Sequence, residues 1–80
     1  MSEHEFTTLL SKRPFVPFRV EVSDGTSYVI RHPEMVIPTG YAAHIGVPRK
    51  KGKGFDRVAI VSMEHVVKLV PLPAAAKEPA

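Results

Sequence analysis

Cysteine is absent from this 80-residue sequence, so no disulfide can stabilise its fold, and the composition fits a reducing cytoplasm. Residues 1–5 have neither the basic region nor the apolar region of a secretory signal peptide. No apolar run approaches the roughly 20 residues that are needed to cross a membrane. We therefore expect one cytoplasmic domain without a membrane partner, with a small core that forms without crosslinks.

Catalytic motifs are missing as well. The sequence contains no nucleophile elbow and no glycine-rich phosphate loop after a strand. His32, His44 and His65 show no i, i+4 spacing and fall in no recognised metal motif, although Glu34 and Glu64 lie close to two of them. We expect no enzyme, no cofactor and no metal site, unless these histidines meet across an interface between subunits.

The strongest local pattern is a β-hairpin over residues 17–31. Apolar and charged residues alternate between Phe18 and Val22, which is typical of a strand with one wet face. Asp24 and Gly25 then offer the two left-handed positions of a type I′ turn. The pattern predicts that the chain returns as a second strand at residues 27–31.

A short helix is expected before this hairpin. Residues 2–5 have the spacing of a capping box, and Phe6, Leu9 and Leu10 form one apolar stripe. Pro14 ends the helix. A helix of about ten residues is unstable alone, so its stripe must pack against an open end of the sheet.

Three further strands follow, at residues 41–47, 56–62 and 66–70. A short apolar run at residues 35–37, which a turn ends, is not counted as a strand. Residues 58–61 and 66–70 are almost continuously apolar, which indicates that a second layer or a partner subunit covers their outer face. Residues 48–54 form a basic loop that cannot pack in a core.

The order of these elements predicts a mainly β fold. An N-terminal helix caps a five-stranded, strongly bent small barrel of the SH3-like kind over residues 1–72, and residues 73–80 form a flexible tail. An open α+β sheet with the helix on one face is the structural alternative.

This order resembles the Sm-like family, whose bacterial members form RNA-binding rings. Residues 20–28 are similar to the family's first hairpin, and residues 58–69 to its last two strands. The family's RNA-contacting positions differ: residues 32–35 replace a segment that usually carries Asp and Asn, and residues 62–65 replace an Arg-Gly or Lys-His element. The resemblance therefore implies the fold more than the binding residues.

A second resemblance covers most of the chain. Residues 13–19 (Arg-Pro-Phe-Val-Pro-Phe-Arg), the Asp24-Gly25 pair and residues 32–34 (His-Pro-Glu) are similar to a pattern in a group of small bacterial proteins of unknown function. It implies no activity.

The basic loop is the best candidate for function, although the net charge of +3 is only a mild excess. Its cations can neutralise phosphates, whereas the plainer interpretation is a solvated hairpin tip. Tyr41 is a candidate for stacking on bases, while Tyr28 is expected in the core. The predicted nucleic-acid contacts are Arg49, Lys50, Lys51, Lys53 and Tyr41.

Two functions are consistent with these patterns. The first is a non-catalytic homo-oligomer that binds RNA or another nucleic acid through the basic loop. The second is a protein-interaction or scaffold module that pairs its apolar edge strands with a protein partner and binds no nucleic acid.

Overall fold

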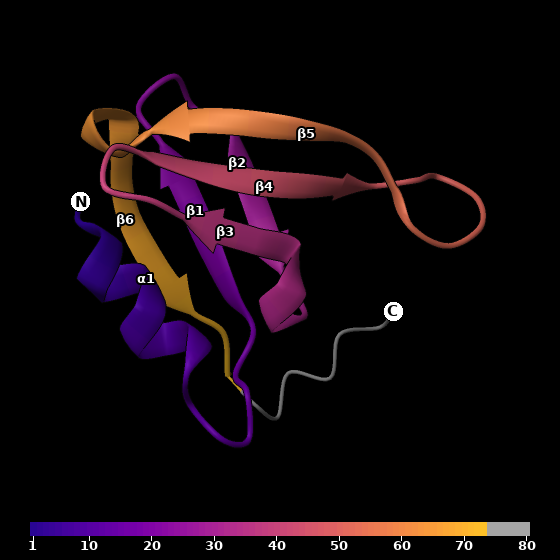
Figure 1. The fold of residues 1–80 in the computed structure, drawn as a ribbon, viewed down its shortest axis with the longest axis horizontal. Helices are drawn as coiled ribbons and strands as arrows, with labels where there is room; N and C mark the ends of the chain where they lie inside the picture. The colour runs from indigo at the N-terminus through magenta and orange to yellow at the C-terminus, as the bar shows by residue number, and fades with distance from the viewer. Residues whose placement is uncertain (74–80) are drawn as a thin grey trace.

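A computed structural model describes residues 1–73, which form one short helix, six strands and two 3-10 turns (Figure 1). In chain order these elements are α1 (Glu3–Leu10), β1 (Phe18–Val22), β2 (Ser27–Ile30), η1 (Pro33–Met35), β3 (Val36–Pro38), β4 (Ala42–Pro48), β5 (Phe55–Ser62), η2 (Met63–His65) and β6 (Val66–Pro71). The strands form two antiparallel sheets: sheet A has the order β2-β1-β6, and sheet B has the order β3-β4-β5.

The predicted mainly β fold with an N-terminal helix is confirmed, but the barrel is not. In the described part of the chain the two sheets remain separate, and β2 and β5 are sheet edges that do not pair with each other. The six strands include β3, which the sequence count of five omitted. This strand has three residues, too few to show a periodicity, and it forms because Val36 pairs with Ile45 of β4. The predicted tail lies outside the described residues apart from Pro73.

The predicted hairpin is present, with a different turn. Val20 pairs with Tyr28, and Val22 N donates to Thr26 O at 3.0 Å. Gly25 N donates to Val22 O at 2.9 Å, and Gly25 has a φ of +91°. The loop therefore has three residues, of which only the last needs the left-handed conformation of glycine, instead of a two-residue type I′ turn. The Thr26 N–H, which would bond to the Ser23 carbonyl in the shorter loop, donates instead to the Asp24 carboxylate at 3.0 Å.

The core lies between the two sheets and contains no buried polar side chain among the described residues. Phe18, Val20 and Ile30 of sheet A are fully buried and face sheet B, where Ile45 is 1% exposed. Helix α1 adds Phe6, whose ring meets that of Phe18 edge-on at a centroid distance of 6.3 Å. The apolar stripe of the helix thus packs into the core, as its length requires.

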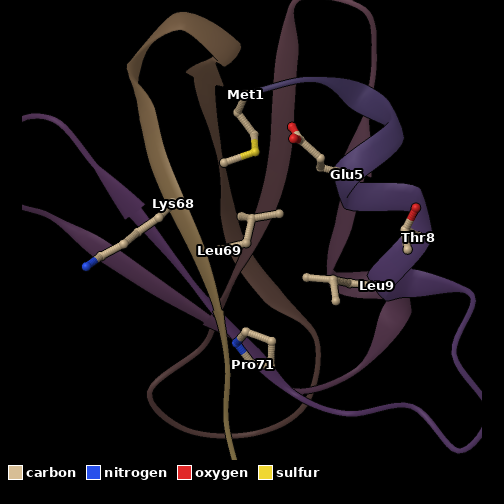
Figure 2. Close-up of a pocket in the computed structure, with 7 residues that line it drawn as sticks. All are labelled: Met1, Glu5, Thr8, Leu9, Lys68, Leu69 and Pro71. Atoms are coloured by element: carbon tan, nitrogen blue, oxygen red, sulfur yellow. The ribbon is translucent and has the colours of Figure 1, made fainter.

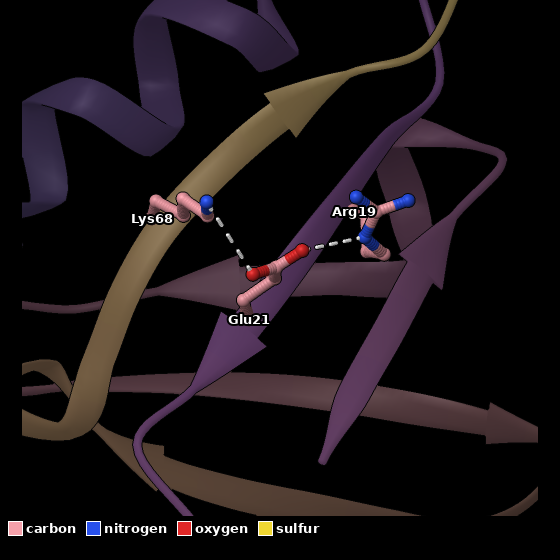
Figure 3. A network of polar contacts seen from close by, with 3 residues as sticks. All are labelled: Arg19, Glu21 and Lys68. Carbon is pink, nitrogen blue, oxygen red and sulfur yellow. Dashed lines mark hydrogen bonds and ion pairs between the residues drawn. The ribbon is translucent and has the colours of Figure 1, made fainter. Parts of the chain in front are cut away.

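The outer faces of the two sheets differ in polarity. On sheet A, Glu21 accepts from Arg19 Nε at 2.8 Å and lies 3.9 Å from Lys68 Nζ, which Figure 3 shows as one polar network. On sheet B, the outer face carries Ile37, Val58 and Ile60, which are 65%, 58% and 68% exposed. Residues 58–61 are therefore apolar on both faces of β5, but no element of the described chain covers the outer face. None of the helices among residues 1–73 is long and apolar enough to span a membrane.

Candidate nucleic-acid interface

The basic loop forms the tip of a long β-hairpin. Strands β4 and β5 continue beyond the core, and Figure 1 shows the loop between them projecting away from both sheets. Arg49 N donates to Gly54 O at 3.2 Å and closes the loop, while Gly52 and Gly54 take φ values of +84° and +86° that suit glycine. We call residues 48–57 the arm.

The arm holds the excess positive charge of the whole chain. It contains five cations and one carboxylate, against six cations and seven carboxylates elsewhere in the sequence. Arg57 is paired with the only carboxylate of the arm, Asp56, at 3.1 Å. The other four cations are exposed and make no ion pair within residues 1–73: Arg49, Lys50, Lys51 and Lys53. A positive surface on a projecting hairpin is suited to contact with phosphates.

Tyr41 lies at the other end of β4. It is 81% exposed in the turn between β3 and β4, and its carbonyl accepts the Met63 N–H at 2.7 Å. At about 3.3 Å per residue along the strand, Tyr41 is about 26 Å from Arg49. The structure therefore does not bring Tyr41 to the basic loop. Tyr28 is half-buried and packs against the core, as the sequence indicated.

Phe55, which the sequence analysis missed, is the aromatic residue at the base of the arm. It is 40% exposed and lies across the strand pair from Pro48. Its ring covers Gly46 so closely that a Cβ atom at that position would lie 2.7 Å from Phe55 Cδ2. A glycine one strand away from an aromatic residue is the pattern that indicates such a contact.

A cavity of about 530 Å³ lies beside Phe55. Its other walls come from the arm and from the segment that follows β2, including Arg31 and His32. This cavity adjoins the basic tip, because Gly52 and Gly54 of the loop belong to its lining.

The cavity between α1 and β6 has a volume of about 410 Å³. Figure 2 shows Met1, Leu9 and Leu69 facing the gap, while the Lys68 ammonium group points away from it. The Glu5 carboxylate in its wall already accepts from Ser2 N at 2.8 Å and from Ser2 Oγ at 3.0 Å. These bonds lower the pKa of Glu5 and occupy its oxygen at the helix start. Both bonds use Oε1 of Glu5, and the remaining lining of the groove is mainly apolar, from Met1, Leu9, Leu69 and Pro71.

His32, His44 and His65, three of the four histidines of the sequence, lie in different parts of the fold and form no shared site within the described residues. His65 Nδ1 lies 3.1 Å from Ser23 Oγ, beside a further cavity between the first hairpin and β5. His44 lies on the outer face of sheet B, and His32 follows β2. Among residues 1–73, no three side chains of the metal-binding types come together.

An apolar surface accompanies the arm on the same sheet. Ile37 and Ile60 lie on either side of His44 in the register of sheet B, and Val58 follows on β5. We call Ile37, Val58 and Ile60 the outer row. Isolated exposed apolar residues are common, whereas three neighbouring ones on one face indicate an interaction surface.

The chain matches no protein-family model, no curated protein and no solved structure at a significant level.

Proposed function

We propose that this protein is a non-catalytic, homo-oligomeric module that binds nucleic acid, in particular RNA, in the cytoplasm. The observation that carries the proposal is the arm, where one projecting hairpin carries four exposed cations that make no ion pair with the described part of the chain. Cations that neutralise phosphates release the counterions condensed on the nucleic acid, which favours binding without any base contact. A mobile lysine positions a phosphate and reads no sequence, so we expect broad specificity.

Self-association is part of the proposal because the four cations of one arm bind nucleic acid only weakly, whereas several arms on one assembly bind more tightly. The outer row leaves three apolar side chains in water, and covering each of them is worth up to about 1.5–3 kcal/mol. The outer row of a second copy of this chain is equally apolar, so two copies can cover each other's exposed side chains. Such an assembly presents several arms to one nucleic-acid strand. Linked arms then bind at a high effective concentration, so the whole assembly binds more tightly than one arm.

The Sm-like and SH3-like barrel class belongs to the same proposal. The helix, the first hairpin and the final β5-η2-β6 unit occur in the order that the resemblance implies. We interpret the two sheets as a small barrel that is open at both junctions, because neither edge of sheet A (β2 and β6) pairs with an edge of sheet B (β3 and β5).

A salt titration of binding tests the proposed function. The probe is a fluorescein-labelled 20-nucleotide oligo(U) RNA, and binding is followed by fluorescence anisotropy. Four phosphate contacts on a single strand give a slope of log K against log salt near about −2.8, so the affinity falls about 50-fold between 50 and 200 mM salt.

The matched variants carry the same change of charge in two places. Replacing Lys50, Lys51 and Lys53 with glutamate abolishes binding, whereas replacing Lys12, Arg13 and Lys68 with glutamate leaves most of it. Thermal unfolding shows that both variants fold. Equal losses in the two variants, or no loss in the arm variant, contradict the proposal.

The alternative is a protein-interaction module, which the exposed outer row and the free edge of β5 favour. Pairing on a sheet edge and apolar contacts respond little to salt. Binding to a protein partner that persists at 500 mM salt, together with no binding of RNA at 50 mM, would support this alternative.

A further inference from the structure

We propose that Phe55 and the cavity beside it bind one unpaired base of a single-stranded nucleic acid. The inference rests on the proposed function and adds the class of strand and a specific contact residue.

The ring of Phe55 is held in place from one side. The three ring atoms nearest to a Cβ at position 46 would lie 2.7, 2.8 and 2.8 Å from it, so the ring meets Gly46 with its face instead of its edge. The side chain is outside the buried core cluster and remains 40% exposed. A ring supported on one face and open on the other is a stacking platform.

The cavity has room for a base. Its volume of about 530 Å³ lies within the range of about 300–1,000 Å³ that is typical of ligand pockets. Pro48, Gly52 and Gly54 of the arm line one side, where the two glycines add no side chains of their own. A base that enters here lies against Phe55.

The charges of the cavity wall and of the basic tip determine whether the base or the phosphate of a nucleotide enters the cavity. Arg49 Nε lies 3.9 Å from the position that a Cβ of Gly54 would occupy, so the guanidinium group stands near the rim of the cavity. Glu34 and Arg31 both line the wall, so their formal charges cancel and the cavity carries no excess positive charge for a phosphate, whereas the tip does. The neutral base therefore enters, while the phosphates on either side remain with the cations of the tip. In a duplex the base faces are already stacked, so a duplex lacks this contact.

The test compares single-stranded oligo(U) RNA with an RNA duplex of the same length, at 100 mM salt. The variant Phe55→Leu keeps an apolar side chain and removes the aromatic face. Loss of one stacked base weakens single-strand binding about 5- to 150-fold. Duplex binding and the salt dependence stay unchanged, because no charge is altered. Tyr41→Ala, an exposed aromatic residue at the far end of β4, is the matched control and has no effect.

Fluorescence gives a second readout. The chain contains no tryptophan, so Phe55→Trp provides a single tryptophan at the site, whose emission lies at longer wavelength than that of the two tyrosines. Stacking of a base quenches its emission upon addition of oligo(U), while Tyr41→Trp is not quenched. Gly46→Ala places a methyl group against the ring, displaces it and weakens single-strand binding as Phe55→Leu does.

The outcomes separate the two proposals. If the arm lysine variant loses binding while Phe55→Leu binds normally and Phe55→Trp is not quenched, the stacking site is wrong and the proposed function stands. Equal weakening of duplex binding by Phe55→Leu also overturns the stacking site. If the unsubstituted protein binds neither RNA, both proposals fail.

Discussion

Replacing Phe6 with alanine should remove a large part of the stability of the fold. Phe6 is fully buried, and it is the only residue of α1 that reaches the core completely. Truncating a buried phenylalanine costs about 3–5 kcal/mol, and this includes the loss of the edge-on contact with Phe18. A chain of 80 residues has a total stability of about 4–12 kcal/mol.

Urea unfolding followed by circular dichroism measures this loss. With a slope of about 1 kcal/mol/M for a protein of this size, the midpoint of Phe6→Ala falls by about 3 M or more. Leu10→Ala is the graded control, because this side chain is only half-buried and costs about 1 kcal/mol. A Phe6→Ala variant that loses no more than the Leu10→Ala variant would refute the view that α1 is anchored through Phe6.

Two further predictions concern the first turn and the response to acid. Gly25→Ala should lower the free energy of unfolding by about 1–2 kcal/mol, because a φ of +91° is strained for alanine even though no atom lies within 4 Å of the added Cβ. Gly40→Ala is the control: this position is equally open and lacks the positive φ, so the free energy of unfolding should change by less than about 0.5 kcal/mol. Hydrogen bonds from Ser2 lower the pKa of Glu5 from its ordinary value of 4.5, and those from Thr26 lower the pKa of Asp24 from 3.8. Because the unfolded chain takes up these protons first, the stabilisation is complete above pH 4.5 and is lost as the pH falls through the lowered pKa values. The melting temperature of the unsubstituted protein should therefore approach that of a Glu5→Gln, Asp24→Asn variant at acid pH, and a constant difference would contradict this.

Local patterns predicted the parts of the fold that depend on neighbours in the sequence. The alternation from Phe18 to Val22 and the apolar stripe of the helix both appear in the structure. The turn type was wrong because two loop lengths fit the same Asp24-Gly25 pair. The bond from Thr26 N to the Asp24 carboxylate, together with the Val22–Thr26 bond that closes the loop, fixes the longer one.

The basic loop of the candidate site could be predicted from the sequence, because its composition alone excludes it from the core. Four cations and two glycines cannot form a core, so an exposed loop followed directly from the residues. The position of Tyr41 relative to the loop depends on strand pairing, which places Tyr41 at one end of β4 and the basic tip at the other. The position of Phe55 depends on Gly46 of the neighbouring strand, and no local periodicity contains that relation.

The open edge of β5 also bears on solubility. Among the described residues, β2 and β3 are short edge strands, and Pro38 ends β3, which limits pairing with other chains. Strand β5 has eight residues, and its charged pair Asp56 and Arg57 protects only the end near the arm. The uncharged segment 58–61 has the composition of a sequence that nucleates aggregation when it is exposed. Self-association that covers this segment would therefore protect it from aggregation. If the proposed assembly forms, variants that weaken it should precipitate at concentrations at which the unsubstituted protein remains in solution.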